Sequence, residues 1–308
     1  MNLRYFYLLL PIDRQTVKEY NITIDRQTDR LKRECAKMLA TKFGRNSFGI
    51  RSNVPLTDAE IFRVAPSIYA TTPHESRSSK YTYIPTSTVL DGLRKEGFNP
   101  FMVVQSKSRI EGKSEYTKHM LRLRHVNAIA TAETPEIILI NSHDGTSSYQ
   151  MLSGVFRFVC QNGMVCGDTY NDIRVPHRGN IADNVIEAAY TVVEDFETVN
   201  NVINEFKHTP LALPEAKIFA EAALSLRYEE EAPIIPDRLL QIRRRDDIEN
   251  NLWNTFNVVQ ENIIRGGLHG KNTAGNRTTT RAINSIDTNV KLNKALWTLT
   301  EKMAELKR

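Results

Sequence analysis

The chain has 308 residues, of which 41% are hydrophobic and 25% charged, a composition that supports a substantial core and excludes disordered, low-complexity and membrane-spanning classes. The three cysteines show neither a disulfide framework nor zinc-ligand spacing, which favours a cytoplasmic protein. The net charge is only +5, but residues 183–231 carry 11 acidic and 3 basic side chains while the rest of the chain carries a net +13.

The first 98 residues form the least regular part of the sequence. Apolar spacing predicts an amphipathic helix over residues 28–43, and the polar stretch 70–80, which contains Pro73, indicates a loop or hinge. A short helix is expected over residues 87–96 and ends at Gly97. We divide the chain into an N-terminal mixed region (1–98), a β core (99–180) and a helical region (181–308).

Beyond residue 100 the apolar residues recur with period two. Four strands are predicted, at residues 101–109, 119–126, 136–141, and 154–160 leading into 165–167. No helix-length segment separates them, so an antiparallel meander is expected. Asn162-Gly163 suits a type I′ turn, which predicts a hairpin that places Cys160 and Cys166 on opposite faces of the sheet.

After Pro176 the period returns to that of a helix. The spacing predicts a long helix over residues 183–206 and further helices beginning near Pro214, Asp247 and Asp287. The expected fold is therefore α+β: an antiparallel sheet backed by a C-terminal helical layer, with the 183–206 helix covering one face.

Alternation along the predicted strands separates apolar from basic residues. One parity holds Met102, Val104, Leu121, Leu123, Phe156 and Phe158. The opposite parity and the connection beside it supply Lys107, Arg109, Lys113, Lys118, Arg122, Arg124 and Arg157. We expect one basic sheet face that binds phosphates, with Tyr116 nearby for base stacking. The alternative is that these side chains only keep the sheet soluble.

A second basic element is the connection over residues 265–281, with four glycines and no acid. Its cations are Arg265, Lys271, Arg277 and Arg281. Cations beside glycine backbone amides can follow a phosphate chain without reading bases, although a plain mobile connection between helices would have the same composition.

The tract 141–149 concentrates groups that could act chemically. His143 and Asp144 could serve as base and orienting acid toward Ser147, or ligate a metal. A turn in which Asp144 caps backbone amides and Gly145 takes positive φ explains the same residues. No phosphate loop, dinucleotide fingerprint or metal-ligand spacing occurs, so we expect no cofactor and assign no catalytic residue.

Residues 135–147 and 156–163 resemble the signature of a phage- and plasmid-borne family called domain of unknown function 932, as do residues 118–124, 253–256 and 265–267. The resemblance covers most of the chain from about residue 80 to the end. It implies residence on a mobile element and no established activity.

The leading hypothesis is a nucleic-acid-binding accessory protein of a mobile element that binds or anneals single-stranded DNA in recombination and forms a homo-oligomer. The first alternative is an inhibitor that binds a host defence protein. The second is a hydrolase or nuclease that uses His143 and Asp144. Binding to a membrane is not expected.

Overall fold

The structure is a computed structural model that describes residues 47–75, 83–108, 110, 112–128, 133–157, 162–166, 172–175 and 181–308. All of them belong to one compact unit, residues 42–308. The helix expected over residues 28–43 lies outside these residues, as do Arg109, Phe158 and Cys160. The three-part division of the chain stays a prediction.

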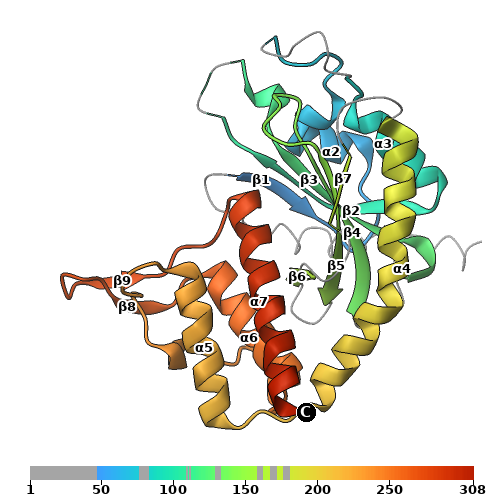
Figure 1. The fold of residues 1–308 in the computed structure, drawn as a ribbon. Helices are drawn as coiled ribbons and strands as arrows, with labels where there is room; N and C mark the ends of the chain where they lie inside the picture. The colour runs from blue at the N-terminus through green and yellow to red at the C-terminus, as the bar shows by residue number, and fades with distance from the viewer. Residues whose placement is uncertain are drawn as a thin grey trace, which may run out of the picture. The chain divides into compact units, whose positions relative to one another are not determined.

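An antiparallel sheet forms the centre of the described structure (Figure 1). Its strands are β1 (Ser47–Arg51), β2 (Phe98–Ser106), β3 (His119–His125), β4 (Glu133–Asn141), β5 (Tyr149–Arg157), β6 (Asn162–Val165) and β7 (Asp172–Val175). The first six pair in chain order, and β7 pairs with β5 beyond the end of β6. The sheet and the helices that follow confirm the α+β class, whereas the short strands β1 and β7 were not expected.

Helices cover both faces of this sheet. On one face lie α2 (Asp58–Val64), α3 (Thr86–Lys95) and α4 (Ile181–His208), which share a core with Val103, Leu121 and Ile137. The predicted long helix is thus confirmed as the cover of one face. The other face packs Met102, Ile138 and Leu152 against Ile286 of α7 (Ile286–Lys307). Both parities of the central strands are therefore buried, which the sequence alternation did not predict.

The C-terminal helices also form a core of their own. Helices α5 (Leu213–Arg227), α6 (Leu252–Arg265) and α7 pack around the aromatic side chains of Trp253, Phe256 and Trp297. Between α6 and α7 the chain makes a two-stranded ribbon of β8 (His269–Lys271) and β9 (Arg277–Thr279). Short 3-10 turns occupy Pro66–Tyr69, Ser114–Tyr116, Val126–Ala128, Pro236–Arg238 and Arg245–Asp247.

The hairpin turn predicted at Asn162-Gly163 is wrong. Asn162 and Gly163 lie in β6, directly opposite Arg157 and Phe156, so they do not form the turn. Gly163 serves a different purpose, because a Cβ there would lie 2.5 Å from Nη1 of Arg122. The glycine makes room for a guanidinium instead of supplying a positive φ.

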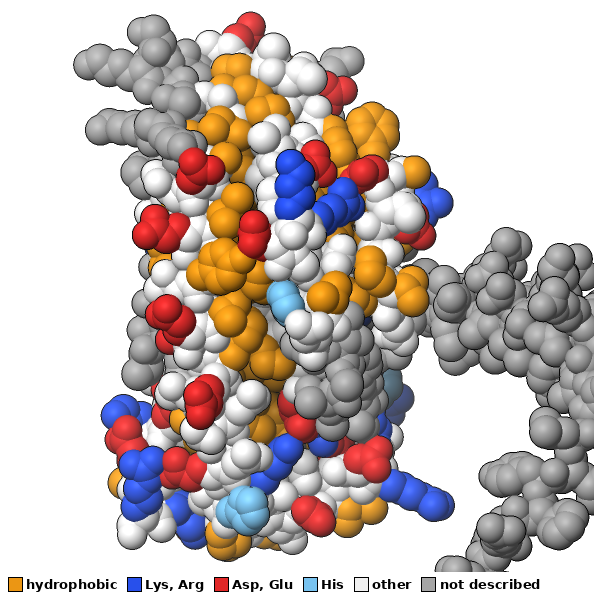
Figure 2. Space-filling model, turned by 90° about the vertical axis from the view of Figure 1, so that its right-hand side faces the viewer, with side chains coloured by type: hydrophobic (Ala, Val, Ile, Leu, Met, Phe, Trp, Pro, Cys, Tyr) orange, Lys and Arg blue, Asp and Glu red, His pale blue; other side chains and the backbone are white. Residues whose placement is uncertain are grey.

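Helix α4 presents an apolar and acidic surface. Figure 2 shows hydrophobic side chains running along this face with acidic side chains on both sides. The exposed residues of α4 include Asp183, Glu187, Tyr190, Glu194 and Glu197. The negative charge of this face repels a polyanion. None of the described helices is long and apolar enough to cross a membrane.

Candidate nucleic-acid interface

Two of the arginines expected on a basic sheet face are buried under the helices. Arg122 and Arg124 are 2% and 0% exposed and flank the fully buried Glu136 of β4. Arg122 Nη1 donates to Glu136 Oε2 at 2.9 Å and to the Met164 carbonyl at 3.1 Å. Arg124 Nε donates to Glu136 Oε1 at 2.8 Å, and its guanidinium lies 3.8 Å from the Phe156 ring centroid.

This Arg122–Glu136–Arg124 cluster joins two guanidiniums to one carboxylate and so carries a net charge of +1. Burial would raise the pKa of Glu136, but the two guanidiniums outweigh it and hold that pKa below its usual value. A buried charge persists only when partners compensate its lost hydration. The expectation that Arg122 and Arg124 project from an exposed basic face is therefore wrong: they neutralise a carboxylate within the core.

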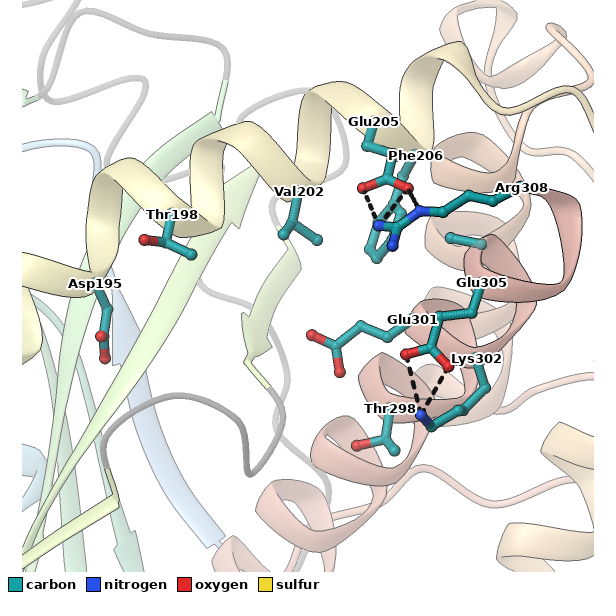
Figure 3. A pocket seen from close by; sticks show the side chains of 11 residues that line it. Asp195, Thr198, Val202, Glu205, Phe206, Thr298, Glu301, Lys302, Glu305 and Arg308 are labelled. Carbon is teal, nitrogen blue, oxygen red and sulfur yellow. Dashed lines mark hydrogen bonds and ion pairs between the residues drawn. The ribbon is translucent and has the colours of Figure 1, made fainter.

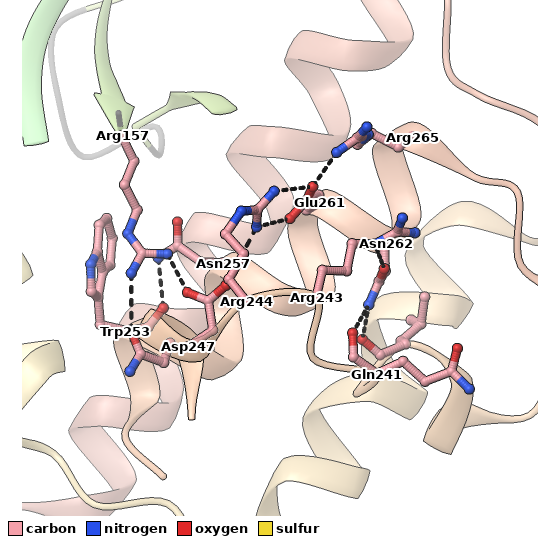
Figure 4. Close-up of polar contacts among 12 residues, drawn as sticks. Arg157, Gln241, Arg243, Arg244, Asp247, Trp253, Asn257, Glu261, Asn262 and Arg265 are labelled. Atoms are coloured by element: carbon pink, nitrogen blue, oxygen red, sulfur yellow. Dashed lines mark hydrogen bonds and ion pairs between the residues drawn. The ribbon is translucent and has the colours of Figure 1, made fainter. Parts of the chain in front are cut away.

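Arg157, the third expected sheet cation, joins the sheet to the helical region (Figure 4). It is 5% exposed, and its Nη1 lies 2.5 Å from Asp247 Oδ1. Asp247 also pairs with Arg244, which binds the carboxylate of Glu261 on α6. Arg157 therefore holds two layers together and cannot contact a ligand on the surface.

The cations beside the sheet lie in different surroundings. Lys107 is exposed after β2, whereas the half-buried Lys113 lies 3.3 Å from Asp144. Lys118 Nζ donates to both carboxylate oxygens of Asp287 on α7, at 2.7 and 2.8 Å. Tyr116, expected to stack bases, contacts the ring of His74 instead.

The basic connection over residues 265–281 exposes all four of its cations. Lys271 and Arg277 are exposed and directly opposite each other in the β8–β9 ribbon, and Arg281 is exposed just beyond it. Arg265 is also exposed but pairs with Glu261. The ribbon extends away from the helices in Figure 1.

Specific contacts hold the ribbon at its middle and at its turn. Lys271 N donates to the Pro233 carbonyl at 2.8 Å, and a Cβ at Gly270 would lie 1.8 Å from that oxygen. At the tip, Asn272 Oδ1 accepts from the amides of Ala274 and Asn276. The choice between a phosphate-binding element and a plain mobile connection stays a prediction.

A groove of about 420 Å³ between the sheet and α7 gathers cations that the sequence did not single out. Three of its lining residues are cationic and are called its rim: Arg174 of β7 with Lys291 and Lys294 of α7. Four are apolar and are called its floor: Ile140, Leu152, Val290 and Ala295. Asp287 also lines this basic groove and is paired with Lys118, which is not part of the lining, so the four charged lining residues sum to +2. Sequence spacing missed it because β7 and α7 are more than 100 residues apart.

A second groove, of about 440 Å³, lies between α4 and the C-terminal half of α7 (Figure 3). It is lined by four acids, Asp195, Glu205, Glu301 and Glu305, and by two bases, Lys302 and Arg308. Both bases pair with carboxylates in the same groove. One helix thus borders a basic groove near its first turns and an acidic groove near its last.

The tract 141–149 does not assemble a catalytic triad. Asp144 Oδ1 accepts from the Thr146 amide at 3.0 Å, and Gly145 has φ +77°, as the turn alternative predicted. Ser147 Oγ donates to the Ser148 carbonyl at 2.9 Å and accepts from Gln150. His143 is fully buried and its Nε2 lies 3.3 Å from Thr86 Oγ1, not against Ser147.

His143 instead belongs to a buried polar cluster that spacing could not reveal. Thr86 Oγ1 lies 2.9 Å from Nε2 of His119, whose Nδ1 is 2.8 Å from Ser67 Oγ. Because Ser67 donates to Gln105, its oxygen accepts from Nδ1–H of His119, which leaves Nε2 to accept from Thr86. Burial, with His143 nearby, lowers the pKa of His119 well below 6.5, so it stays neutral. No group of three metal-ligating side chains occurs among the residues described.

The α+β sheet with both faces covered and the two grooves along α7 define a compact scaffold that lacks an assembled catalytic centre among its described residues. The family described as Domain of unknown function (DUF932) matches residues 73–297, and the chain belongs to it. The chain is similar to two proteins of Escherichia coli (strain K12), UPF0380 protein YafZ and UPF0380 protein YfjQ. It is 48% and 49% identical to them over 266 residues, which cover 86% of this chain and 97% of each relative. No solved structure matches.

Proposed function

We propose that the protein binds nucleic acid through its phosphates, with the β8–β9 ribbon as the primary contact. The observation that carries this proposal is the cross-strand pair of Lys271 and Arg277. Like charges directly opposite each other on a strand pair repel, and neither side chain forms an ion pair with any residue that the structure describes. A phosphate between them would convert that repulsion into two attractions.

The surroundings of the ribbon support the same conclusion. Residues 265–281 contain no acid, and Arg281 extends the positive charge. Lys and Arg contacts to phosphate carry no sequence information, so this surface would bind many sequences alike. The acidic and apolar face of α4 would then be directed away from the nucleic acid.

The experiment is fluorescence anisotropy with labelled single-stranded and duplex oligonucleotides over a range of salt concentrations. The variant Lys271→Ala/Arg277→Ala should bind more weakly and lower the slope of log K against log salt by about 1.8 for a duplex, or about 0.9 per lost contact.

The matched control is Lys217→Ala/Lys302→Ala, which removes two exposed lysines that are paired with Asp237 and Glu305. This control alters the net charge by the same amount and should retain the parent slope. A parent protein that fails to bind at low salt would overturn the proposal and leave the host-protein alternative in first place.

A role on a mobile element, in recombination or against host defence, stays a prediction from the sequence. The hydrolase alternative also stays a prediction, and His143, Asp144 and Ser147 each have other hydrogen-bond partners.

A further inference from the structure

We infer that the basic groove between the sheet and α7 holds an unpaired segment of nucleic acid, with phosphates on its rim and a base against its floor. This inference rests on the proposed function and adds a preference for single strands. It concerns residues distant in sequence from the ribbon: Arg174 on β7, and Lys291 and Lys294 on α7.

The chemistry of the lining favours this occupant. The rim cations suit phosphate oxygens, while Val290 and Ala295 are only half-buried and present apolar surface between those cations. An isolated inorganic anion would leave that apolar surface in contact with water. A nucleotide carries both a charged and a flat, weakly hydrated part, so it satisfies both halves of the lining.

The same lining disfavours a duplex. Paired bases remain stacked inside the double helix and expose only their edges in the grooves. A duplex could therefore not place a base against Val290. A single strand can turn a base out of its stack and bury it, as proteins that bind single-stranded nucleic acid commonly require.

The two grooves along α7 provide an internal comparison. They have similar volumes, about 420 and 440 Å³, and share one helix. The charged residues that line the second groove sum to −2, so phosphate should be excluded from it. The same Lys→Ala substitution can therefore be made on α7 both in the basic groove and in the acidic groove.

The test measures binding of a single-stranded oligonucleotide and of a duplex with the same sequence. The variant Lys291→Ala/Lys294→Ala should lower the salt slope for the single strand by about 1.4, or about 0.7 per lost contact, and weaken single-strand binding at least tenfold. Duplex binding should change less than threefold, because the ribbon is intact. The control Lys302→Ala should match the parent on both substrates.

A blocking variant tests the floor separately from the charge. Ala295→Glu places a carboxylate in the basic groove and should abolish the preference for single strands, whereas Thr298→Glu, in the acidic groove, should not. Thermal melting of each variant should show that the fold is retained.

Three outcomes overturn the inference: unchanged single-strand binding in the groove variants, equal losses for single strand and duplex, or a nucleoside monophosphate that competes as well as an oligonucleotide. If the ribbon variant alone loses binding, the proposed function survives and the groove assignment fails. If the parent binds neither substrate, both fail.

Discussion

Arg122 and Arg124 on β3, and Lys271 and Arg277 on β8–β9, are basic pairs on short strands, but the fold treats them in opposite ways. The β3 pair shares the buried carboxylate of Glu136, and α7 covers that face of the sheet. The ribbon pair is exposed with no such carboxylate within the described structure. Basic residues on a strand therefore form a cationic surface only where no other element covers that face of the strand.

The first prediction concerns a variant that removes the carboxylate from the buried cluster. Glu136→Gln leaves two guanidiniums in the core with a neutral amide between them, so we expect a loss of about 3–5 kcal/mol in the free energy of unfolding. Urea denaturation measures it. Glu305→Gln, in an exposed pair on α7, should cost less than about 1 kcal/mol. Equal costs for both variants would show that the β3 arginines are not held as the structure indicates.

The second prediction tests how tightly the cluster is packed. In Gly163→Ala the new methyl group would lie 2.5 Å from Arg122 Nη1, so the guanidinium must shift away from Glu136 and the Met164 carbonyl. Overpacking of this kind costs about 1–3 kcal/mol. Gly275→Ala at the exposed tip is not a matched control, because its φ of +77° adds backbone strain. Gly112 is unsuitable as a control for the same reason, because its φ is also positive. The stability of Gly163→Ala is therefore compared with that of the parent protein.

The sequence predicted the sheet but not the roles of its arginines. Period two placed β2, β3 and β4 within a few residues, because alternation is a local property. Whether α7 lies on the second face depends on a contact across more than 100 residues. One local signal did exist: the acidic Glu136 directly precedes the apolar run Ile137 to Ile140.

The candidate site was only partly predictable for the same reason. The ribbon cations Lys271 and Arg277 could be found from composition, since a connection with four bases and no acid is a local signal. The basic groove joins β7 to α7, and the His119 cluster joins five separate segments. Neither arrangement leaves a spacing pattern in the chain.

The third prediction concerns pH and the buried histidine cluster. Burial, with His143 nearby, keeps the pKa of His119 well below 6.5, whereas the unfolded chain takes up a proton near that value. Stability should therefore be constant above about pH 6.5 and fall as the pH decreases below it, by at most about 1.4 kcal/mol per pH unit. Glu136 and Asp144, whose pKa values are lowered, lose stabilisation only below about pH 4.5.

Unfolding at pH 5, 6, 7 and 8 separates these contributions. His119→Gln should be less stable than the parent at pH 8, and the gap should narrow toward pH 5 because the variant lacks this titration. A gap that is the same at every pH would show that His119 is not held neutral in the folded protein.

The smallest expected effect on the free energy of unfolding is that of replacing the two ribbon cations, which contrasts with the arginines of β3. Lys271 and Arg277 face each other without a carboxylate between them, so replacing both by Ala removes a repulsion and no ion pair within the described residues. The backbone contact from Lys271 N to the Pro233 carbonyl does not depend on the side chain. We therefore expect a change in the free energy of unfolding within about 0.5 kcal/mol, of either sign. Stability and nucleic-acid binding should be measured on the same preparation. An almost unchanged free energy of unfolding together with weaker binding would identify the ribbon as a ligand-binding surface. A large loss of stability would instead mean that these two cations, like those of β3, serve the fold.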